Sequence, residues 1–201
     1  PGEMIDYLVD SDYPLPVSPV KPPDQAARRI GEIIAANFIH DGATLQYGIV
    51  QVPEAVTDAI LAKGVADLGI HTEMFTDGVI DLVKSGAVTG AQKTINRRKI
   101  VASFVLGTKR LFDFIHRNPL VELHPSEYVN DPLVISQHDN MVAINVALEI
   151  DLTGQVCADS LGYRFYSGIG GQVDFIRGAS QAKGGKPIIA MPSTARNGEL
   201  S

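Results

Sequence analysis

The feature that most constrains the fold of this chain is an alternation of short apolar runs with segments whose apolar residues recur at helical spacing. The helical spacing is clear over 25–37, and apolar runs of strand length lie at 43–49, 67–71 and 100–106. Strands that alternate with helices pair in parallel, because a crossover helix returns the chain to the same edge of the sheet. We therefore expect an α/β fold with an open, largely parallel sheet flanked by helices.

Local signals place the ends of the helices between these runs. Asp24 is an N-cap candidate for the helix at 25–37, and Pro53 suits a first helical position, where its missing N–H costs nothing. Gly86 ends a helix that begins at Asp77. The remaining expected elements are helices at 109–117 and 173–181 and strands at 120–123 and 187–191.

One further apolar run modifies the expected sheet. Residues 141–150 are long and apolar, Gly154 follows as a turn residue, and a second short run lies at 155–158. This pattern predicts a β-hairpin. Because hairpin strands are antiparallel, we expect an open mixed sheet in place of a purely parallel one.

A proline-rich segment precedes the first expected helix. Five prolines within residues 10–23 exclude a helix there and favour an extended chain. We assign 1–23 to an interdomain linker and 24–201 to one domain. A disordered amino terminus is the alternative that the residues leave open.

Charge and composition exclude several classes of function. Asp and Glu total 23 against 17 Lys and Arg, a formal net charge of −6, and phosphate backbones require concentrated positive charge, so we expect no nucleic-acid partner. The sequence has no signal-peptide pattern and no run of roughly 18 apolar residues, so we expect no membrane partner. The single Cys157 forms no internal disulfide, which favours the cytoplasm.

The first candidate for chemistry is Glu73, which we expect just beyond the carboxyl end of the buried strand at 67–71. Ligands and catalytic groups collect at that edge of open α/β sheets. A carboxylate there acts as a base, a metal ligand or a nucleophile, and the alternative is a solvated side chain. His71 is a candidate contact for a ligand, but a lone His-x-Glu offers too few ligands for zinc, so we expect no metal.

Glycines before the helix at 173–181 form the second candidate. Gly168, Gly170 and Gly171 let the backbone approach a ligand, and free N–H groups at a helix amino terminus hold phosphate or a developing oxyanion. The segment lacks the glycine spacing of dinucleotide-binding proteins and the Lys-Ser/Thr ending of a P-loop. A nicotinamide enzyme or an NTPase is therefore a poor fit.

A third candidate is the strand-to-helix turn within 45–53. Gln46 lies at its start and Ile49 within it, where backbone N–H groups of such turns reach ligands. An ordinary βα turn explains the same residues when they are taken in isolation.

Taken in order, these segments resemble the carboxyl-terminal catalytic domain of the acetyl-CoA hydrolase/transferase family, and within it the 4-hydroxybutyrate CoA-transferase branch. The resemblance covers nearly the whole chain after the prolines. It includes His71-Thr72-Glu73-Met74 and Gly168-Ile169-Gly170-Gly171. The matching segments are 45–49, 68–78, 107–109, 121–125, 151–156, 168–179 and 183–194.

The resemblance implies a CoA-transferase-like fold and a ping-pong mechanism on Glu73. The carboxylate of Glu73 is the expected nucleophile, forming an acyl-glutamyl anhydride and then a glutamyl-CoA thioester. The amides near Ile49, Gly168, Gly170 and Gly171 are the expected oxyanion and CoA-binding groups. Gln46 and His71 are candidate contacts to substrate or CoA. The turn at Gly48-Ile49-Val50 departs from the family, whose members commonly have a second glycine where Val50 stands.

The same resemblance sets the remaining expectations. CoA is a substrate, no cofactor is permanently bound, and the partners are acyl-CoA and short-chain carboxylic acids such as 4-hydroxybutyrate, butyrate and acetate. A homodimer or larger homo-oligomer is expected. Family members carry a related α/β domain ahead of this one and a further segment after it, so we expect a fragment of a longer two-domain enzyme. The alternatives are an acyl-CoA hydrolase that uses the same Glu73 and a catalytically silent CoA-binding or assembly module.

Overall fold

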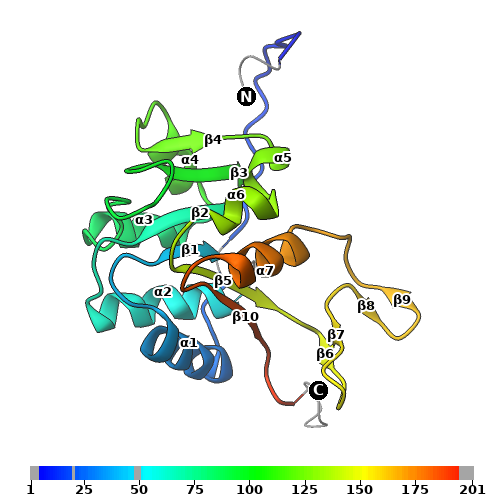
Figure 1. The fold of residues 1–201 in the computed structure, drawn as a ribbon. Helices are drawn as coiled ribbons and strands as arrows, with labels where there is room; N and C mark the ends of the chain where they lie inside the picture. Colours follow the sequence, from blue (N-terminus) through cyan, green and yellow to red (C-terminus); the bar gives the residue numbers. More distant parts are fainter. Residues whose placement is uncertain (1–4, 20, 48–50, 195–201) are drawn as a thin grey trace.

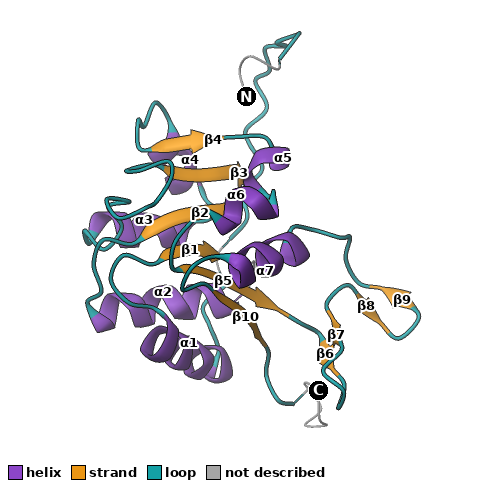
Figure 2. Ribbon diagram, in the orientation of Figure 1, coloured by secondary structure: helices purple, strands orange, loops and turns teal. Residues whose placement is uncertain are grey.

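A six-stranded sheet lies at the centre of the described part of the chain (Figures 1 and 2). The computed structural model describes residues 5–19, 21–47 and 51–194. The strands are β1 (Thr44–Tyr47), β2 (Gly69–Phe75), β3 (Ile100–Val105), β4 (Val121–Leu123), β5 (Met141–Val146) and β10 (Lys186–Ala190). They lie in the order β10-β5-β1-β2-β3-β4, and each described pairing is parallel. The expected α/β fold class is confirmed.

Helices cover both faces of this sheet (Figure 1). One face carries α1 (Gln25–Phe38), α2 (Gln51–Lys63), α3 (Asp77–Lys84) and α4 (Lys109–Ile115), and the other carries α5 (Ser126–Val129), α6 (Pro132–Ser136) and α7 (Gln172–Gln181). Asp24 caps α1 as expected, because its carboxylate accepts a 2.9 Å hydrogen bond from the Ala27 N–H. Pro53 is the third residue of α2, where its N–H would also have no helical acceptor.

The expected hairpin is correct at its turn and wrong in its first strand. Gly154, with a φ of 87°, lies between β6 (Glu149–Ile150) and β7 (Val156–Cys157), which pair antiparallel. Met141–Val146 instead forms β5 of the parallel sheet, because its apolar residues are buried on both faces. A second antiparallel pair joins β8 (Ser160–Leu161) and β9 (Arg164–Phe165), so the antiparallel strands lie outside the main sheet (Figure 2).

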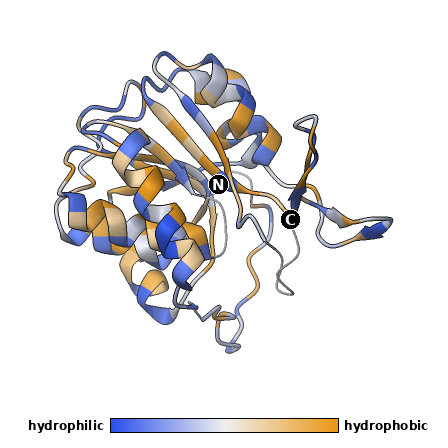
Figure 3. Ribbon diagram, turned by 90° about the horizontal axis from the view of Figure 1, so that it is seen from below, coloured by the Kyte–Doolittle hydropathy of each residue, from blue (hydrophilic) through white to orange (hydrophobic). Residues whose placement is uncertain are grey.

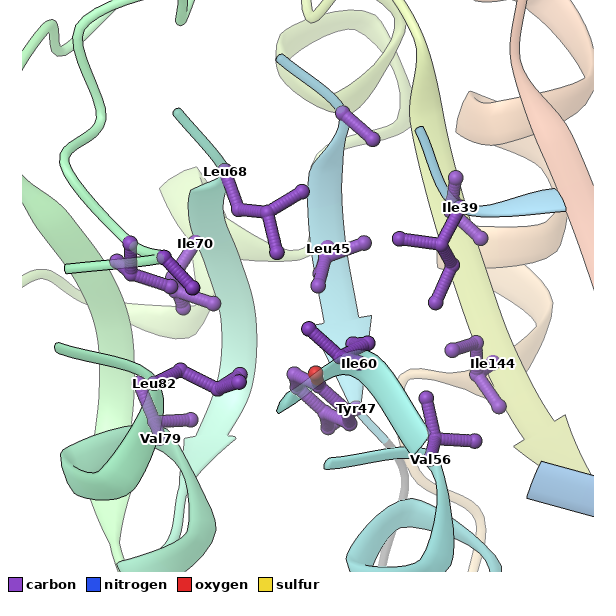
Figure 4. Close-up of a cluster of buried hydrophobic side chains, with 14 of the residues drawn as sticks. Ile39, Leu45, Tyr47, Val56, Ile60, Leu68, Ile70, Val79, Leu82 and Ile144 are labelled. Carbon is purple, nitrogen blue, oxygen red and sulfur yellow. The ribbon is translucent and has the colours of Figure 1, made fainter. Parts of the chain in front are cut away.

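Buried apolar side chains form one cluster on each face of the sheet. Figure 3 shows hydrophobic residues along the strands and on parts of the helices. On the α1–α4 face, Leu45, Ile70 and Ile144 from three adjacent strands meet Ile60 of α2 and Leu82 of α3 (Figure 4). On the opposite face, a smaller cluster includes Phe175 and Ala179 of α7. Burial of these side chains is the main favourable term that holds the two layers against the sheet.

The close crossing of α1 and α2 depends on Gly31. A Cβ at Gly31 would lie 2.6 Å from the Ala55 carbonyl carbon and 2.8 Å from the Val56 nitrogen. Replacement of an exposed helical Gly by Ala stabilises a protein by about 1 kcal/mol. Here we expect the opposite sign, a loss of about 1–3 kcal/mol, because backbone atoms must move apart. Urea unfolding of Gly31→Ala measures it, with exposed Glu32→Ala as the control, and an unchanged or raised stability would contradict this packing.

The order of the strands reverses at β1. The chain runs outward from β1 through β2, β3 and β4, and then returns to add β5 and β10 on the other side of β1. This reversal is a topological switch point, and open α/β sheets bind ligands beyond the carboxyl ends of the strands there. Gln46 of β1 and Glu73 of β2 lie near the carboxyl ends of these strands.

The amino-terminal segment contacts the loop that follows β3. The Ser18 N–H donates a 2.9 Å hydrogen bond to the Gly107 carbonyl, and residues 5–19 contain no helix or strand. The segment then extends away from the sheet (Figure 1). Its assignment as an interdomain linker stays a prediction. Among the described helices, none has both the length and the apolar character needed to cross a bilayer.

Candidate functional site

Glu73 lies within a strand and not beyond one. We expected the strand to end at His71, but β2 continues to Phe75 because Met74 and Phe75 pair with Phe104 and Val105 of β3. A single acidic residue in an apolar segment is typical of a strand end, and this pattern led to the expectation of a shorter strand. The side chain is half-buried and still lies near the carboxyl end of β2, beside the switch point.

The carboxylate of Glu73 meets the amino terminus of α7. The Gly171 N–H donates a 2.9 Å hydrogen bond to Glu73 Oε2, and Gly171 is the N-cap residue of α7. Helix amino termini carry a partial positive charge, which stabilises a carboxylate or any negative charge that develops beside it. The contact brings Gly171 and Glu73 together, while the role of Gly171 as an oxyanion or CoA-binding group stays a prediction.

Asn130 is a third member of this site, and the sequence analysis missed it. A Cβ placed on Gly171 would meet both Glu73 Oε2 and, at 2.6 Å, Asn130 Nδ2. The Asn130 side chain therefore borders the same point as the carboxylate. Its Oδ1 is buried and accepts no hydrogen bond from the described residues. Asn130 directly follows α5, and no local pattern signals that α5 folds back over β2.

Gln46 joins the two strands at the switch point. Its Oε1 accepts a 2.9 Å hydrogen bond from Asn145 Nδ2, and its Nε2 donates to Asn145 Oδ1 at 3.4 Å. Only 3% of Gln46 and 6% of Asn145 are exposed. This reciprocal pair satisfies both amides and ties β1 to β5, while a contact of Gln46 with substrate or CoA stays a prediction.

His71 is fully buried beneath the site. It has no exposed surface, and its Nε2 lies 2.8 Å from the Val129 carbonyl oxygen. The structure therefore places the ring where it supports the site, and no surface of it is free for the expected contact with CoA or substrate. Burial lowers the pKa of His71 to about 4, which keeps the ring neutral.

The remaining expected residues are not gathered around Glu73 by described contacts. Gly168 and Gly170 are exposed, and among the described residues no heavy atom outside their chain neighbours lies within 4 Å of a Cβ placed on either. Ile49, with the rest of the turn at 48–50, lies outside the described residues. Within the described part of the chain, no group of three or more His, Cys, Asp and Glu side chains is arranged to hold a metal ion.

Two more buried basic groups lie near His71. His138 has no exposed surface, its ring centroid is 4.5 Å from that of His71, and neither ring nitrogen has a partner among the described residues. Burial lowers the pKa of His138 to about 2. Lys93 donates to the Ile70 and Lys99 carbonyls at 2.9 and 2.8 Å, and burial lowers its pKa to about 7.

These lowered pKa values predict acid sensitivity. The unfolded chain binds protons on His71 and His138 near pH 6.5 while the folded chain does not, so stability falls as the pH drops from 6.5 to 4. Protonation of Lys93 lowers the stability of the fold only as the pH falls from 10.5 to about 7. We expect His138→Leu to reduce the acid-induced loss in the free energy of unfolding by about 2–3 kcal/mol. Urea unfolding at pH 7 and pH 4.5 measures it, and equal losses in both proteins would contradict neutral burial.

Comparison with known proteins gives this site a family context. Residues 107–201 match the family model described as "Acetyl-CoA hydrolase/transferase C-terminal domain". The chain is 51% identical to 4-hydroxybutyrate coenzyme A transferase of Clostridium kluyveri over 98% of its own length and 45% of that protein. It is 45% identical to succinyl-CoA:cyclohexane-1-carboxylate CoA transferase of Geobacter metallireducens, over 98% of its length and 44% of that protein.

A solved structure shares the fold. The crystal structure of 4-hydroxybutyrate CoA-transferase from Porphyromonas gingivalis matches 92% of this chain and 44% of that chain, with 45% identity and a TM-score of 0.80. The chain thus spans under half the length of the curated relatives described above. Identity at this level along nearly the whole chain, with the matched family model and the shared fold, shows that the chain belongs to the acetyl-CoA hydrolase/transferase family.

Proposed function

We propose that the protein containing this chain is an acyl-CoA:carboxylate CoA-transferase whose nucleophile is Glu73. The observation that carries the proposal is the 2.9 Å hydrogen bond from the Gly171 N–H to Glu73 Oε2 at a helix amino terminus, in a chain of this family. The proposed substrates are acyl-CoA thioesters and short-chain carboxylates of the 4-hydroxybutyrate, butyrate and acetate type. The name of the Clostridium relative supports 4-hydroxybutyrate as a substrate.

In the first half-reaction, the Glu73 carboxylate attacks the thioester carbon and expels CoA thiolate, which leaves an acyl-glutamyl anhydride. The thiolate then attacks Cδ of Glu73 and expels the acyl group as a free carboxylate, so that a glutamyl-CoA thioester remains. An acceptor carboxylate reverses both steps and leaves as the new acyl-CoA. Covalent catalysis of this kind divides one difficult exchange into easier steps and conserves the thioester.

The structure suggests how negative charge is stabilised during these steps. Attack on Cδ of Glu73 moves charge onto a carboxyl oxygen of Glu73, and Oε2 already accepts from the Gly171 N–H. Asn130 Nδ2, which borders the same point, is the proposed second donor. Each preorganised donor of this kind contributes on the order of 10²–10³-fold in rate. The amides near Ile49, Gly168 and Gly170 remain proposed contacts for CoA.

Transfer and hydrolysis differ only in what attacks the glutamyl thioester. Exclusion of water favours transfer, because water then cannot replace the acceptor carboxylate. We therefore expect CoA of the donor thioester to appear in a new acyl-CoA when the complete protein is incubated with butyryl-CoA and acetate. Release of free CoA at the same rate with and without acetate would support a hydrolase. CoA binding without either product would support a catalytically silent module.

We also propose a cofactor requirement, an oligomeric state and a location for the protein. CoA serves as a substrate with no permanently bound cofactor, and the protein forms a homodimer or larger homo-oligomer in the cytoplasm. Light scattering of the complete protein measures the assembly directly.

A further inference from the structure

The ring of His71 contacts both helical elements that contribute groups to the Glu73 site. It hydrogen-bonds the Val129 carbonyl at the end of α5, and its centroid lies 6.1 Å from that of Phe175 in α7. The Asn130 side chain follows Val129 directly, and Phe175 lies one turn after Gly171, to whose carbonyl its N–H donates at 3.0 Å. His71 itself lies on β2, two residues before Glu73.

The hydrogen bond to Val129 indicates which ring nitrogen of His71 carries a proton. A carbonyl oxygen only accepts, so the ring nitrogen Nε2 carries the proton and donates it. Nδ1 is then the unprotonated nitrogen, and it has no partner among the described residues. The ring therefore acts as a neutral, single-donor group.

The placement of α5 depends on such contacts. α5 has only four residues, and one helical turn has little stability of its own. Val129 is fully buried, and its carbonyl lies at the carboxyl end of the helix, where carbonyls lack intrahelical partners. The bond from His71 supplies that partner and fixes the backbone immediately before Asn130.

We infer that His71 is a positioning residue: its Nε2–H bond to the Val129 carbonyl holds the Asn130 amide against Gly171 and Glu73. This inference rests on the proposed function for its kinetic consequence, but its structural consequence is independent of any activity. A single strand thereby positions the carboxylate directly and its neighbouring amide indirectly. A shift of reacting groups by about 1 Å lowers the rate by a factor on the order of 10². Loss of the hydrogen bond between His71 and Val129 is therefore expected to lower the rate measurably.

The kinetic test compares variants of the complete protein. His71→Leu keeps a similar apolar volume and removes the donor, and we expect kcat for CoA transfer to fall by about 10- to 100-fold with KM for acyl-CoA changed by less than about threefold. His71→Gln restores a donor N–H, and we expect it to recover most of kcat. His138→Leu is the matched control, because it removes a neighbouring buried imidazole and leaves the Val129 bond in place.

A double-mutant cycle separates positioning from general destabilisation. If His71 acts through Asn130, adding His71→Leu to Asn130→Ala lowers kcat by less than about threefold beyond Asn130→Ala alone. Fully multiplicative losses would overturn the inference. So would equal loss of kcat in His71→Leu and His138→Leu.

Crystal structures of the wild type and His71→Leu test the same inference without turnover. We expect the Asn130 side chain to move away from Gly171 in His71→Leu and to stay in place in His71→Gln. An Asn130 that keeps its place without the His71 bond would overturn the inference even if CoA transfer is confirmed. Absence of transfer in the wild type would overturn the proposed function and leave this structural comparison decisive for His71.

Discussion

Replacement of Glu73 by Gln is expected to lower CoA transfer by at least about 10³-fold. The amide keeps an oxygen that accepts from the Gly171 N–H, but it removes the carboxylate that must attack the thioester. Because the change is nearly isosteric, the fold and CoA binding are expected to persist. Transfer is measured by the appearance of a new acyl-CoA, and binding by calorimetry with CoA.

The matched control for this variant is Glu32→Gln, an exposed carboxylate on α1 whose only described ion pair is with exposed Arg29. We expect this control to keep full activity, since exposed pairs contribute little to stability. Turnover within tenfold of the wild type in Glu73→Gln would exclude Glu73 as the nucleophile. Unfolding of the variant would instead show that Glu73 stabilises the structure.

Replacement of Gly171 by Ala is expected to produce the second large loss, on the order of 10² in kcat. A Cβ at this position would overlap Glu73 Oε2 and lie 2.6 Å from Asn130 Nδ2, so both groups must shift. The backbone of Gly171, with φ −76° and ψ 5°, is one that Ala also adopts. The loss therefore arises from displacement of the site and not from backbone strain.

Gly170→Ala provides the comparison for this prediction. In the described part of the chain, no heavy atom outside the two chain neighbours lies within 4 Å of its Cβ position, and alanine keeps the backbone N–H that CoA is proposed to contact. We expect its loss of kcat to be at least tenfold smaller than that of Gly171→Ala. Similar losses in the two variants would show that the whole glycine segment, and not the contact with Glu73, requires small residues. Thermal unfolding of both variants verifies that they remain folded.

Much of the fold was predictable because its signals are local. The Asp24 cap and the helical spacing after it place α1 to within one residue, and the glycines before 173 lead into α7 as expected. β5 was misassigned to a hairpin because its partners are distant in sequence. Gln46 and Asn145, which join β1 and β5, are 99 residues apart, and no local pattern reports such a pairing.

The site was predictable only where chemistry and sequence position coincide. Glu73 stands out as an acidic residue in an apolar run, and the Gly171 N–H reaches it. Asn130 has no such signal, because its place depends on how α5 folds over β2. His71 was expected at a ligand because it precedes Glu73 by two residues, but adjacency in a strand does not reveal which residues the helices cover.

The most direct test of the central claim is to trap the covalent intermediate on Glu73. The complete protein is treated with acyl-CoA, reduced with borohydride and analysed by peptide mass spectrometry, with an untreated sample and Glu73→Gln as controls. We predict that a side-chain alcohol replaces the carboxylate at Glu73 only after exposure to acyl-CoA. An unmodified Glu73 in a sample that transfers CoA, or the alcohol at another carboxylate, would contradict the account.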